Sequence, residues 1–72
     1  MSNPIKVDAM RLGANIRRKR KEMGLFQYVL AENAEIHAIT LCRIEIGQII
    51  PTLATLKAIA KVLGCGLDEL VG

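Results

Sequence analysis

Apolar residues recur every three or four positions along most of this chain, the spacing that places side chains on one face of an α-helix. The first such stretch follows Asp8, a favourable helix N-cap, and ends at Gly24, a residue suited to terminate a helix. Thr52 and Gly64 delimit another stretch in the same way. The pattern predicts this first helix, further helices over about 27–33, 37–46 and 53–63, and a terminal helical turn over 66–70.

The same spacing predicts which side chains form the core. Five helices with short connections favour an all-α bundle without a sheet. Around the tight turn at 33–36, the apolar residues fall where two helices that cross one another would bury side chains between them. The inward positions are Leu12, Ile16, Leu30, Ala31, Ala34, Ile36, Leu41 and Ile44, then Leu53, Leu56, Ile59, Ala60 and Leu63, and finally Leu67 and Leu70.

Chain length and the first residues define the expected domain organisation. Seventy-two residues are enough for one domain with a small core. Residues 1–7 contain Pro4 and little apolar pattern, so we expect a flexible N-terminal arm followed by a single domain over 8–72.

Charge and hydropathy restrict the possible partners only loosely. The net charge is +3, and five of the ten basic residues form the run 17–21, which we interpret as a solvated helix face. This charge permits a nucleic-acid partner without requiring one. The mean hydropathy of +0.31 is high for a small domain, so we expect apolar side chains on the surface.

Residues able to carry catalysis or hold a metal are scarce. Cys42 and Cys65 lack the spacing of a zinc site and are expected to be reduced thiols, and His37 is the single histidine. No set of residues suggests a nucleophile, a general base or a phosphate loop. We therefore expect no enzyme, cofactor or small-molecule substrate. Without a signal peptide or a membrane span, we expect a cytoplasmic protein.

Six short motifs carry a resemblance that covers more than four-fifths of the chain. They are LGANIR at 12–17, GLFQ at 24–27, LAE at 30–32, LCRIEIG at 41–47, PTL at 51–53 and LGCGLDEL at 63–70. In this order they resemble the Cro and lambda-repressor family of helix-turn-helix domains, and most closely the restriction-modification controller proteins. The resemblance implies a five-helix bundle with the helix-turn-helix from about Gln27 to Ile46, and an ion pair between Arg20 and Glu45.

The resemblance also indicates which residues would meet DNA. In this family the helix starting near His37 lies in the major groove, and its flanks contact the backbone. Several residues in and around this helix depart from the pattern that the resemblance implies. Phe26 replaces a small polar residue, and Ala38 and Ile39 replace polar residues. In the turn before the helix, Glu35 replaces the usual glycine. The implied base-reading positions are His37, Ala38, Ile39 and Arg43, and the implied backbone-contact positions are Phe26, Gln27, Ile46, Gln48, Ile49 and Ile50.

Two functional hypotheses follow from these departures. The first, preferred on the sequence alone, is an engineered scaffold whose DNA face has become an apolar surface that binds another protein or a second copy of the chain. That surface would consist of Phe26, Tyr28, His37, Ala38, Ile39, Cys42, Arg43, Ile46, Ile49 and Ile50.

The alternative is a dimeric transcriptional regulator that recognises a palindromic DNA operator. Arg43 would be its main base reader, and Gln27, Gln48 and the backbone amides of the second helix would contact phosphate. Its DNA-binding residues would be Gln27, His37, Ala38, Ile39, Arg43 and Gln48.

Overall fold

The computed structural model describes residues 7–72, and all described elements are helices. They are α1 (Ala9–Glu22), α2 (Gln27–Asn33), α3 (Ala38–Glu45), α4 (Leu53–Leu63) and α5 (Leu67–Val71). The predicted all-α class and the five predicted elements are confirmed. The predicted arm lies outside the described residues except for Val7, which is half-buried and packs against the core.

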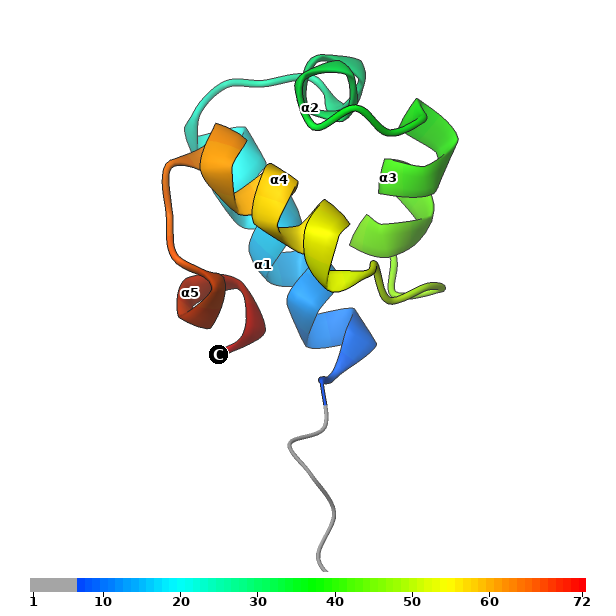
Figure 1. The fold of residues 1–72 in the computed structure, drawn as a ribbon, viewed down its shortest axis with the longest axis vertical. Coiled ribbons are helices and arrows are strands. Elements are labelled where there is room, and N and C mark those ends of the chain that lie inside the picture. Colours follow the sequence, from blue (N-terminus) through cyan, green and yellow to red (C-terminus); the bar gives the residue numbers. More distant parts are fainter. Residues whose placement is uncertain (1–6) are drawn as a thin grey trace, which may run out of the picture.

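The helices are arranged around α1, which packs against both α3 and α5. In Figure 1, α1 and α4 occupy the centre of the bundle, α3 lies on one side of them and α5 on the other. Helix α2 packs on α3 and on α4, and α4 packs on α5. No described helix has the length and apolar character needed to cross a membrane.

Aliphatic side chains contributed by every helix form one core. Most of the predicted inward positions are buried, and Ile36 and Leu67 are half-buried against them. Leu53 was predicted to face inward but is 59% exposed, because it is the first residue of α4 and precedes the turns that pack on the bundle. The buried apolar residues are Leu12, Ile16, Leu30, Ala31, Ala34, Leu41, Ile44, Leu56, Ile59, Ala60, Leu63 and Leu70.

The ends of α1 and α4 follow the predicted capping chemistry. The carboxylate of Asp8 accepts hydrogen bonds from the backbone amides of Met10 and Arg11, at 3.0 and 3.1 Å. The hydroxyl of Thr52 accepts one from the amide of Thr55, at 3.2 Å. Each bond satisfies an amide that has no partner within the helix.

Gly13 lets α1 and α3 approach each other at backbone distance. A Cβ atom at this position would collide with the carbonyl oxygen of Ile44 and lie 2.6 Å from that of Glu45. A glycine in the middle of a helix lowers helix propensity, and here the absence of a side chain places the end of α3 directly on α1. The position of α3 therefore depends on this residue.

Candidate functional site

A buried ion pair fixes the end of α3 relative to the end of α1. Arg20 Nε donates to Glu45 Oε2 at 2.7 Å, and Arg20 Nη2 donates to Glu45 Oε1 at 3.0 Å. The side chains are only 9% and 1% exposed. The pair implied by the family resemblance is confirmed. Such a two-point contact restrains orientation as well as distance.

The same carboxylate and guanidinium also hold the start of α2. Gln27 Nε2 donates to Glu45 Oε1 at 2.9 Å, and Arg20 Nη1 donates to the carbonyl oxygen of Leu25 at 2.8 Å. Three segments of the chain, the end of α1, residues 25–27 and the end of α3, therefore meet at one buried cluster, defined here as the Arg20–Glu45 network. Gln27, expected to contact phosphate, is half-buried and has its amide nitrogen engaged in this network.

A tight turn joins α2 to α3 and sets the angle between them. Ala34 is buried, and the amide of Ile36 donates to the carbonyl of Ala31 at 2.9 Å. Glu35 adopts a left-handed backbone conformation with φ of 60°. This conformation is sterically unfavourable for a residue with a side chain and is the one that glycine adopts most readily.

The outward face of α3 is mainly apolar. At 100° per residue, Ile39 points away from the buried Leu41, and Ile46 follows two turns later within about 20° of the same direction. Ile39 and Ile46 are 56% and 53% exposed. Ala38 and Arg43 are exposed on this helix as well, and Cys42 is half-buried.

Aromatic and aliphatic side chains flank α3 on both sides. Phe26 and Tyr28 at the start of α2 are exposed, and their rings stack with centroids 5.9 Å apart. After α3, Gln48, Ile49 and Ile50 are exposed in the connection to α4. Sequence reasoning missed Met10, which is 71% exposed and contacts the position of Gly47 in this connection. No local pattern links Met10 to a segment so distant in the sequence.

The N-cap residues of α2 and α3 differ from those of the other long helices. Phe26 and His37 occupy these positions, and neither side chain accepts a hydrogen bond from its helix. This confirms that Phe26 cannot cap α2, because its side chain has no acceptor. The first amides of the two helices are therefore left available to another acceptor.

The helix-turn-helix segment carries little positive charge. Between positions 26 and 50 the chain has one arginine, Arg43, and three glutamates, a formal charge of −2 with His37 neutral. Glu45 is paired with Arg20, which leaves Glu32 and Glu35 on the surface. In the run 17–21, Arg17, Arg18 and Lys21 are exposed as expected, whereas Arg20 is buried and Lys19 bonds to Glu69.

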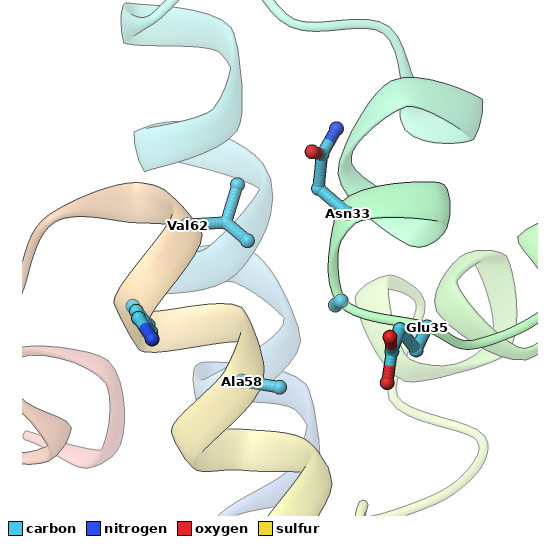
Figure 2. A pocket seen from close by; sticks show the side chains of 6 residues that line it. Asn33, Glu35, Ala58 and Val62 are labelled. Carbon is cyan, nitrogen blue, oxygen red and sulfur yellow. The ribbon is translucent and has the colours of Figure 1, made fainter.

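A groove lies between α4 and the turn that joins α2 to α3. Figure 2 shows Ala58 and Val62 of α4 facing Asn33 and Glu35 across it. Ala34 and Lys61 complete the lining. Within residues 7–72, no three His, Cys, Asp or Glu side chains are grouped so that they could hold a metal ion.

Comparisons with known proteins agree with this arrangement. The family model described as helix-turn-helix matches residues 16–70. The chain is 40% identical over 63 residues to the immunity repressor protein of the Bacillus phage phi105, an alignment that covers 88% of this chain and 44% of the repressor. The chain thus spans less than half the length of that relative.

Solved structures of a controller protein and of a DNA-binding domain have the same fold. The restriction-modification controller protein C.AhdI from Aeromonas hydrophila superposes with a TM-score of 0.84 and 26% identity, covering 90% of this chain and 98% of the controller protein. The DNA-binding domain of BldD superposes with a TM-score of 0.79 and 25% identity, covering 94% of this chain and the whole of that domain.

These matches overturn the first hypothesis, that of an engineered protein-binding module. The similar proteins include a repressor, a controller protein and a DNA-binding domain, and they favour the alternative. The hypothesis failed because it took an exposed apolar surface as evidence of a protein partner. Exposed apolar side chains are common on folded proteins, and the DNA major groove itself presents an apolar group, the thymine methyl.

Proposed function

This chain belongs to the helix-turn-helix family, and on that basis we propose that it is a DNA-binding transcriptional regulator. The observation that carries the proposal is the placement of α3, held by the Arg20–Glu45 network with one face in the core and the other exposed to solvent. A helix presented in this way can enter the major groove, where its N-terminal residues reach the base edges.

In this proposal the exposed residues of α3 read bases and the neighbouring residues contact the backbone. Arg43 is the main polar reader, because a guanidinium can donate to two acceptors of one guanine. His37, Ala38 and Ile39 face the bases near the start of α3. Gln48 and Gln27 contact phosphate. Gln27 would do so through the second hydrogen of its amide nitrogen, because the first is donated to Glu45.

We further propose that the protein acts as a dimer. Two copies related by a two-fold axis would place their α3 helices one turn of DNA apart, about 34 Å, and would recognise a palindromic site. Sedimentation of the protein with a selected duplex measures the stoichiometry directly. Two chains on each duplex are expected, and a single chain on an asymmetric site would contradict the dimer.

Binding to DNA is the first property to test. We would titrate a labelled mixed-sequence duplex with the protein and follow fluorescence anisotropy from low to physiological salt. A regulator of this kind is expected to bind at low salt and to lose affinity as salt rises, since binding releases counterions from the duplex. No binding to any duplex at low salt would contradict the proposed function.

A pair of arginine variants tests whether α3 forms the contact. Arg43→Ala should weaken binding to a preferred duplex by at least about fivefold. Arg18→Ala removes the same charge from an exposed site on α1, where the ion pair with Glu22 is loose at 4.0 Å, and should leave affinity within about twofold. Equal losses in the two variants would indicate a general charge effect and exclude a specific role for Arg43.

A further inference from the structure

Beside His37, which can hydrogen-bond to a base, the exposed side chains at the start of α3 are apolar. Ala38 and Ile39 are both exposed there and offer only methyl and methylene groups. Base edges in the major groove present acceptors, donors and one apolar group, the 5-methyl of thymine. Thymine is therefore the base feature that complements these two residues.

The scarcity of positive charge in the helix-turn-helix segment also favours apolar contacts with the bases. With one arginine against three glutamates between positions 26 and 50, the helix-turn-helix can neutralise few phosphates. The ionic part of binding is then small, and a larger share of the affinity has to come from contacts that salt does not screen. Burial of apolar side chains against methyl groups is a contact of that kind.

We propose that Ala38 and Ile39 read thymine methyl groups, so that the preferred site contains thymines opposite the start of α3. Arg43 lies one turn further along the same helix and would read a guanine beside them. This inference rests on the proposed function and adds to it the class of base pair that α3 selects. It also implies a salt dependence of affinity that is shallow for a DNA-binding domain.

Replacing thymine by deoxyuridine tests the inference, because it removes the methyl group and leaves every hydrogen-bonding atom in place. A preferred duplex would be selected in vitro from a pool with randomised positions, and its thymines would then be replaced one at a time. The loss of a buried methyl predicts about a fourfold fall in affinity at each contacted thymine. Thymines outside the contact should show no change.

Variants identify the residue that contacts the methyl. Ile39→Ala should weaken binding to the thymine duplex and should reduce the effect of deoxyuridine at one position. Val71→Ala is the matched control, since Val71 is an exposed aliphatic residue of α5, on the other side of α1 from α3 in Figure 1. Circular dichroism would verify that both variants remain folded.

The outcomes separate this inference from the proposed function. No binding to any duplex would overturn both. Binding that is unaffected by deoxyuridine at every position would overturn the thymine inference and leave the regulator intact. A deoxyuridine effect that persists in full in Ile39→Ala would overturn the assignment to Ile39. A loss confined to specific thymines and diminished in Ile39→Ala would support the inference.

Discussion

Arg20 of α1 and Glu45 of α3 form a two-point buried ion pair, with donor–acceptor distances of 2.7 and 3.0 Å. Glu45→Gln should reduce the free energy of unfolding by about 3 kcal/mol, because it leaves the buried guanidinium without a counter-charge. Urea denaturation measures the change. The double variant Arg20→Met with Glu45→Leu should be less destabilised than Glu45→Gln, because it leaves no buried charge unpaired. A Glu45→Gln variant as stable as wild type would contradict a structural role for the pair.

Gly13→Ala should destabilise the protein even though alanine favours helices. A methyl group at position 13 would collide with the backbone carbonyls of Ile44 and Glu45, so α1 and α3 would have to separate. We expect a loss of about 1–3 kcal/mol, typical of overpacking. Ala14→Gly, at the exposed neighbouring position, should cost about 1 kcal/mol through propensity alone. A gain in stability for Gly13→Ala would disprove the close approach.

Glu35→Gly should stabilise the turn between α2 and α3. Glu35 has a φ of 60°, where a side chain costs about 1–2 kcal/mol and glycine pays no such penalty. Part of this gain is offset by the greater freedom of glycine in the unfolded chain, so a net increase of up to about 1 kcal/mol is expected. Glu32→Gly, inside α2, should instead lose about 1 kcal/mol. Thermal denaturation of the two variants gives the comparison.

The attachment of α5 to α1 should weaken in acid. The backbone amide of Gly66, followed by the Lys19 ammonium, holds the pKa of the Glu69 carboxyl below its usual value. A lowered pKa contributes stability at pH values above the usual value near 4.5, and this contribution disappears as pH falls through the lower pKa of the folded state.

Thermal denaturation between pH 7 and acid conditions tests this dependence. The Tm of wild type should fall in acid by more than that of Glu69→Gln, which lacks the titrating group. Lys19→Gln should show an intermediate dependence, because the bond from Gly66 remains. Identical pH profiles for wild type and Glu69→Gln would show that Glu69 makes no such contribution.

Local features of the fold could be predicted because they depend on neighbouring residues. The Asp8 and Thr52 caps and the helix end near Gly24 follow from chemistry within one helical turn. The Arg20–Glu45 pair was accessible only through the family resemblance, since 25 residues separate the partners. The role of Gly13 was not predicted, because its contact with α3 depends on how two helices pack. A glycine inside a strong helical pattern was the one sequence feature that could have indicated this close approach.

The exposure of the apolar face of α3 was predicted correctly, and the protein-binding function assigned to that face was wrong. Ile39 and Ile46 are exposed on one face of α3, as helical periodicity indicated. Periodicity reports which side chains leave the core, and it contains no information on the surface that they will meet. Gln27 shows a second limit, since its bond to Glu45 connects residues that lie on different helices.

The division of α3 into a buried and an exposed face bears on how such a domain could change its target. Leu41, Ile44 and Glu45 hold the helix in place, whereas Ala38, Ile39 and Arg43 contribute little to folding because they are exposed. Exposed substitutions of this kind usually change stability by less than about 0.5 kcal/mol. Under the proposed function, new base preferences could therefore arise by single mutations in a lineage that stays folded throughout, and the present apolar face would be one of many that this scaffold can carry.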